Sequence, residues 1–135
     1  MKCLQNFLHP QRKPNIKFIL SSAFADDEGK PLEWEMRELS AKEGAAILRE
    51  LEDEGKSYST QESMMRYIAE ALVVPDLHDA ELVAAVSEEN NGKILKPHQI
   101  LELILTDAEV VKLTNIYAQH SSPGTFAEQI KEAKN

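Results

Sequence analysis

The sequence predicts an α+β fold that is mainly helical: an N-terminal β-hairpin followed by a compact body of four to five helices. Three observations support this prediction. Apolar and polar residues alternate over about residues 16–38, apolar residues recur at helical spacing over 41–119, and helix-start motifs precede several of the helical stretches. With 135 residues the chain has the length of one ordinary domain. We therefore expect a single domain over residues 16–120.

Residues 1–15 are expected to be a docking arm and linker outside this domain. They contain a small apolar cluster and then two prolines that interrupt any continuous helix: Leu4, Phe7, Leu8, Pro10 and Pro14. At the other end the helical pattern breaks after Ser121, so residues 121–135 are expected to be a flexible or marginally helical tail.

The predicted hairpin at residues 16–38 consists of two alternating segments around a turn. Each segment places apolar residues on one face: Ile16, Phe18, Leu20 and Phe24 before the turn, and Leu32, Trp34 and Met36 after it. Residues 26–29 read Asp-Asp-Glu-Gly and supply the turn. Alternation of this kind puts one face on a core and the other in water. We expect Trp34 to anchor the hairpin to the helices and not to be a surface hot spot.

Helix-start motifs divide residues 41–119 into separate helices. Ser40 and Glu43 have the spacing of a capping box ahead of a helix over about 41–54. Thr106 and Glu109 repeat this spacing ahead of the last long helix. Three further starts are predicted from cap residues and from a proline at a first turn: Thr60, Asp79 and Pro97. The helix that begins near Thr60 is expected to continue until Pro75.

No motif in the sequence identifies a catalytic, metal or cofactor site. The four histidines are far apart, and none belongs to a two-histidine helical motif or a Cys/His zinc pattern. His98 and Glu102 share a predicted helix face, which we interpret as an exposed or half-buried surface pair. Gly55-Lys56-Ser57 lacks the earlier glycine of a phosphate-binding loop. We therefore predict that the chain is not an enzyme and folds without a cofactor.

Charge and hydropathy also limit the classes of partner. The chain has 15 Lys and Arg against 23 Asp and Glu, a net charge of -8 that should repel nucleic acid. No stretch approaches the roughly 20 apolar residues that span a bilayer, and the N-terminus lacks the pattern of a signal peptide. We expect neither a nucleic-acid nor a membrane partner. A lone Cys3 fits a reducing cytoplasm.

Met64, Met65 and Tyr67 are the candidate partner-binding residues. Whichever of the two methionines faces outward would offer a flexible apolar contact, as adaptable binding surfaces do. The alternative is that these side chains are simply part of the core, and the sequence leaves both interpretations open. Self-association also remains open at this point.

Three blocks of sequence resemble the XkdN-like tail assembly chaperones of phages and prophages. The first is the hairpin, with Phe24, Asp27 to Pro31, Trp34, Glu35, Arg37 and Ser40. The second contains Val74 to Leu77 and Asp79 to Leu82, and the third is the helical region from Ile100 to Tyr117. Together they span about residues 16–118. The chain departs from the family at Thr106-Asp107, where members often have Pro-Gly.

This resemblance implies a non-catalytic chaperone of tail morphogenesis. Such chaperones keep the long, helical, aggregation-prone tape measure protein soluble and help to recruit tail tube subunits around it. The implied partners are therefore the tape measure protein and the tail tube protein. The implied location is the cytoplasm of the bacterial host, with no copy in the mature virion. The alternative is an acidic regulatory protein that mimics DNA charge and blocks a nucleic-acid-binding partner.

Overall fold

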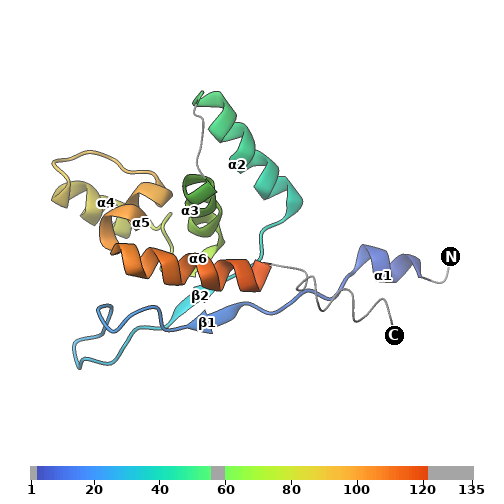
Figure 1. Cartoon of the computed structure of the whole chain (residues 1–135), viewed down its shortest axis with the longest axis horizontal. Coiled ribbons are helices and arrows are strands. Elements are labelled where there is room, and N and C mark those ends of the chain that lie inside the picture. The colour runs from blue at the N-terminus through green and yellow to red at the C-terminus, as the bar shows by residue number, and fades with distance from the viewer. Residues whose placement is uncertain (1–2, 56–59, 122–135) are drawn as a thin grey trace.

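The computed structural model describes residues 3–55 and 60–121, which form six helices and one three-stranded antiparallel sheet (Figure 1). The helices are α1 (Leu4–Leu8), α2 (Ala41–Asp53), α3 (Thr60–Ala71), α4 (Ala80–Glu89), α5 (Pro97–Ile104) and α6 (Asp107–Ser121). The strands are β1 (Ile16–Phe18), β2 (Trp34–Met36) and β3 (Leu72–Val74). The predicted fold class is confirmed: α2 to α6 form the helical body, and α1 is a further helix in the arm. Residues 122–135 of the predicted tail lie outside the described residues.

The sheet has the strand order β1-β2-β3, one strand more than the predicted hairpin. Ile16 pairs with Met36 and Phe18 with Trp34 in the hairpin, while Met36 also pairs with Leu72 of β3. The helix that begins near Thr60 was predicted to continue until Pro75. This prediction was wrong, because α3 ends at Ala71 and strand β3 follows it directly. Two consecutive valines before a proline favour extended backbone, since proline disfavours the helical conformation of the residue that precedes it.

The core lies between the sheet and the helices. Trp34 is 3% exposed and packs edge-to-face against Phe24, with ring centroids 5.3 Å apart. Met36 is fully buried beside it. Leu32 departs from the prediction because it is 46% exposed, although it alternates with these two residues. It lies before β2 begins, so the pleat of the sheet does not turn it toward the core.

Both predicted capping boxes form. Ser40 Oγ accepts the backbone N–H of Glu43 at 3.1 Å, and Glu43 Oε1 accepts that of Ser40 at 3.0 Å. Thr106 and Glu109 make the same two bonds at the start of α6, at 3.2 and 2.8 Å. The Asp79 carboxylate accepts two backbone N–H groups at the start of α4. These helix starts are therefore fixed by local sequence.

Helix α3 occupies the centre of the helical body, where it contacts α2, α5 and α6. In Figure 1, α1 stands apart from this body at the N-terminal end of the chain. Residues 9–15 connect α1 to β1 without a helix or strand. The described part of the chain is therefore a body of sheet and helices with a projecting arm.

Candidate partner-binding site

An apolar pocket opens where α3 meets α6. Ser63, Met64 and Tyr67 of α3 and Tyr117 of α6 line it, and its volume is about 280 Å³. Met64 and Tyr117 are partly buried against the core, and Tyr67 is half-buried. We call this site, defined by these four residues, the tyrosine pocket. It is shallow and accessible from solvent, so its side chains can contact another molecule.

A larger groove of about 610 Å³ continues from the tyrosine pocket and shares Tyr67 and Tyr117 with it. Its remaining wall consists of residues 38–41 and Gly44 around the start of α2, residues 11–13 of the linker, and Ser121. Burial raises the pKa of Tyr117, and the neighbouring Tyr67 adds to this effect. The rings of Tyr67 and Tyr117 therefore lie on a partly desolvated surface. The linker, the start of α2 and the α3–α6 pair surround this surface.

Met65 does not belong to this surface. Its side chain is 1% exposed and lies in the core, on the face of α3 opposite to solvent. Of the three residues predicted to bind a partner, the structure brings Met64 and Tyr67 together in the tyrosine pocket and places Met65 behind them. Sequence reasoning missed Tyr117, which lies 50 positions away on α6 and has no local signal.

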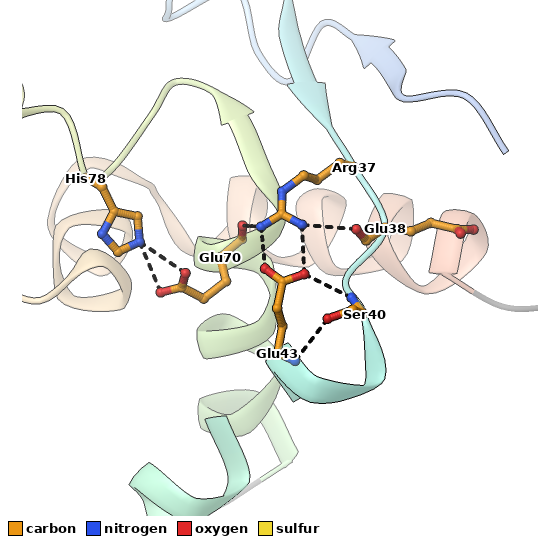
Figure 2. A network of polar contacts seen from close by, with 6 residues as sticks. All are labelled: Arg37, Glu38, Ser40, Glu43, Glu70 and His78. Atoms are coloured by element: carbon orange, nitrogen blue, oxygen red, sulfur yellow. Dashed lines mark hydrogen bonds and ion pairs between the residues drawn. The ribbon is translucent and has the colours of Figure 1, made fainter. Parts of the chain in front are cut away.

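A polar network fixes the wall of the groove (Figure 2). The Arg37 guanidinium donates two hydrogen bonds to the Glu43 carboxylate, at 3.0 and 2.7 Å, and one to the Glu70 carbonyl oxygen at 3.3 Å. The hydrogen bonds from Arg37, together with the backbone bond from Ser40, lower the pKa of Glu43 to about 2. Arg37 thereby joins the end of β2 to the start of α2 and the end of α3. His78 Nε2 lies 3.1 Å from both Glu70 carboxylate oxygens in the same view.

A second charged cluster surrounds Arg66 of α3, whose side chain is only 3% exposed. Its guanidinium nitrogens form ion pairs with three carboxylates: Glu54 at 2.6 Å, Glu50 at 3.5 Å and Glu62 at 3.7 Å. The close contact with Arg66 is the main reason that the pKa of Glu54 falls to about 2. This cluster is not predicted from the sequence. Its one local signal is the four-residue spacing of Glu62 and Arg66 on a helix.

His98 also belongs to this region, and its predicted position on the surface was wrong. The side chain is 7% exposed, whereas Glu102 is exposed. Burial lowers the pKa of His98, and the positive charges of Arg66 and Lys96 lower it further. His98 lines a cavity of about 230 Å³ beside Arg66. The helical periodicity placed His98 on α5 correctly but could not show that α3 packs over it.

The described residues contain no group of three or more His, Cys, Asp or Glu side chains that could hold a metal ion. Within the same ranges, no helix has the length and apolar character that crossing a membrane requires. The arrangement offers surfaces for contact with another molecule: an apolar pocket and an adjoining groove of mixed polar and apolar lining.

A family model described as phage XkdN-like tail assembly chaperone protein matches residues 4–134. The chain belongs to this family of tail assembly chaperones. Membership implies protein partners in phage tail assembly. No curated protein matches this chaperone. Among solved structures, the crystal structure of the protein YqbN is similar, with a TM-score of 0.65 and 17% sequence identity. The match covers 83% of this chaperone and 89% of that chain, and it shows a shared fold.

Proposed function

We propose that this chaperone binds an amphipathic segment of its phage's tape measure protein, keeps that protein soluble and helps to recruit tail tube subunits. It does so without catalysis, in the cytoplasm of the host, and it is absent from the finished virion. The observation that carries the proposal is the tyrosine pocket, an accessible apolar site on the chain of a tail assembly chaperone family.

The pocket has the chemistry for a helical client. An amphipathic helix binds by laying its apolar side chains into a groove, and methionine adapts to apolar side chains of different shape. Met64, Tyr67 and Tyr117 supply the apolar surface of the pocket, and the adjoining groove adds polar and charged side chains beside it. A net charge of -8 would keep a complex with an aggregation-prone client in solution.

Coexpression tests this proposal directly. The chaperone and the tape measure protein of the same phage are produced together, and we expect a higher soluble yield of the tape measure protein and a complex that survives purification. Apolar contacts are little screened by ions, so the complex should persist between low and ~0.5 M salt. If the tape measure protein stays insoluble and no complex forms at any salt concentration, the proposal is wrong. An acidic protein that mimics DNA would instead release a basic partner over this range.

Point variants locate the contact. Met64→Ser and Tyr67→Ser should each reduce recovery of the tape measure protein while the chaperone still unfolds cooperatively. Leu103→Ser is the matched control, because Leu103 is a 53% exposed apolar residue of α5 outside the pocket. Equal losses in all three variants would exclude the tyrosine pocket as the contact site.

A further inference from the structure

The larger groove lies where helix α6 ends. Ser121, the last residue of α6, lines this groove together with Tyr67 and Tyr117 of the tyrosine pocket. The chain continues from this rim with residues 122–135, which lie outside the described residues. A segment tethered at Ser121 is held beside the pocket, and a short tether gives it a high effective concentration there. Even a weak apolar contact would therefore be occupied.

The sequence after Ser121 favours a reversal of the chain direction. Pro123 and Gly124 are the two central residues of the segment 122–125, an order that is typical of a tight turn. Proline also disfavours helical backbone at the residue before it, so α6 is not expected to continue through this point. A turn at this position directs the following residues back along α6, toward Tyr117.

Phe126 is the first large apolar residue after this turn. Tyr117 lies four residues before Ser121, which is about 6 Å along the axis of a helix. Five residues of extended chain span up to about 17 Å, so Phe126 can reach the tyrosine pocket from Ser121. The pocket has a volume of about 280 Å³, which accommodates a phenylalanine side chain.

The charges of the segment do not oppose such a contact. Residues 122–135 contain two Glu and two Lys and so have no net charge, whereas residues 1–121 carry the whole net charge of -8. A neutral segment is not repelled by this acidic body. The groove wall beside it has charges of both signs, from Arg12, Lys13 and Glu38. The contact would therefore depend mainly on apolar packing.

We infer that residues 122–135 fold back over the groove of the same chain and place Phe126 in the tyrosine pocket. The turn at Pro123-Gly124 reverses the chain, and the residues after Phe126 follow the groove. Docking covers an apolar pocket that the described residues leave open to solvent. The contact lies within one chain, so its tests do not depend on the proposed binding of the tape measure protein.

A disulfide within one chain tests this contact. Cys3 is the one cysteine of the sequence, so Cys3→Ser removes the natural thiol. In this background Ser63→Cys places a thiol at the pocket, and Ala127→Cys places a second thiol beside Phe126. Mild oxidation of the dilute protein should close an internal disulfide. The measurement is the rate at which monomers lose their reactivity toward an alkylating reagent.

The matched control combines the same Ala127→Cys with Asn115→Cys. Asn115 is an exposed residue of α6, two positions from Tyr117 and therefore on the opposite face of the helix. Its thiol is within reach of the tethered segment but lies outside the pocket. We expect the disulfide to close at least about tenfold faster with position 63 than with position 115, because docking raises the effective concentration of the first pair.

Equal rates for the two pairs would overturn the inference. Phe126→Asp provides a further check, because it removes the side chain that fills the pocket. Added to the pair at positions 63 and 127, it should lower the rate to that of the control pair. A rate that stays high in this variant would also contradict the inference, since Phe126 would then not hold the segment in place.

A methyl spectrum provides the second test, without any change in the pocket. Methionine methyl groups labelled with ¹³C report an aromatic ring beside them, because the ring shifts their resonance. Phe126→Leu should move the resonance of Met64, which lines the pocket, and leave that of Met36, which is buried in the core. Phe7→Leu is the control, since Phe7 is 76% exposed and lies outside the pocket. An unmoved Met64 resonance in Phe126→Leu, or an equal shift in Phe7→Leu, contradicts the inference.

Discussion

Trp34 is the residue on which the packing of the sheet against the helices depends. Its ring is 3% exposed, with Phe18 and Phe24 of the hairpin region beside it at centroid distances of 6.4 and 5.3 Å. The sequence predicted this burial because the strand pattern turns Trp34 and Met36 to one face. It did not predict that Leu32 of the same pattern stays in solvent, since alternation shows the face of a residue only within a strand.

Trp34→Ala should therefore destabilise the chain by ~3–5 kcal/mol, the usual cost of removing a buried aromatic ring. Leu32→Ala is the control and should cost far less, because Leu32 is 46% exposed. Urea denaturation of the two variants measures both values. A Trp34→Ala variant that unfolds at the same urea concentration as the parent would show that the ring contributes little to the core.

The ion pair of Arg37 and Glu43 makes stability depend on pH. The pKa of Glu43 is about 2 in the folded chain, below its ordinary value of 4.5. The folded state therefore binds this proton less readily than the unfolded chain, so the stability is fully present above about pH 4.5 and is lost as the pH falls toward 2. Glu54, whose pKa is also about 2, acts in the same direction.

Arg37→Gln should flatten this dependence, because the main cause of the low pKa of Glu43 is removed. The measurement is the free energy of unfolding in urea, at a series of pH values between about 5 and 2. Arg49→Gln serves as control, since Arg49 is an exposed residue of α2, and it should leave the slope unchanged. An unaltered slope in Arg37→Gln would mean that this ion pair does not govern acid stability.

At the scale of elements, the starts of the helices could be predicted from the sequence, whereas the end of α3 could not. Capping involves residues three positions apart, so Ser40 with Glu43 and Thr106 with Glu109 identified α2 and α6 from local sequence. The strand β3 is different, because Leu72–Val74 follows the apolar stripe of α3 without a break. Its pairing with β2 is a long-range contact, and helical periodicity alone cannot distinguish it.

The candidate site could be predicted only in part, again because contacts between distant parts of the sequence decide which residues form it. Met64 and Met65 are adjacent, so helical spacing could not decide which of them faces the core. The packing of α3 against its neighbours decides it: Met65 is buried, whereas Met64 lines the tyrosine pocket. Tyr117 completes that pocket from a separate helix, and a buried Arg66 would not be expected from composition, since arginine is rarely buried unless paired.

The cap of α6 provides a test at this scale. Thr106→Ala removes the hydroxyl oxygen that accepts the Glu109 backbone N–H at 3.2 Å, and it should cost ~1 kcal/mol. Thr114→Ala within the same helix is the matched control, because its hydroxyl bonds to the carbonyl of Val111 and caps nothing. Both are compared by urea denaturation. Equal effects would show that the capping box does not stabilise α6 more than an internal threonine does.

For the whole molecule, the proposed function assigns the tyrosine pocket to a helical client. A tape measure segment would place apolar side chains between Met64, Tyr67 and Tyr117, so it would contact both α3 and α6. No residue of α1 lines this pocket, and α1 stands apart from the helical body (Figure 1). The pocket and the arm can therefore be altered independently.

Substitutions in the pocket and in the arm should therefore have different effects. Met64→Ser should recover less tape measure protein per chaperone than the natural chain does, because Met64 lines the pocket. Phe7→Asp and Ile94→Asp should match the natural chain, because these residues are 76% and 77% exposed and lie outside the pocket. The measurement is the ratio of the two proteins in a purified complex over a series of chaperone concentrations. If Phe7→Asp instead recovers less, α1 contacts the tape measure protein itself, and the tyrosine pocket is not the whole contact site.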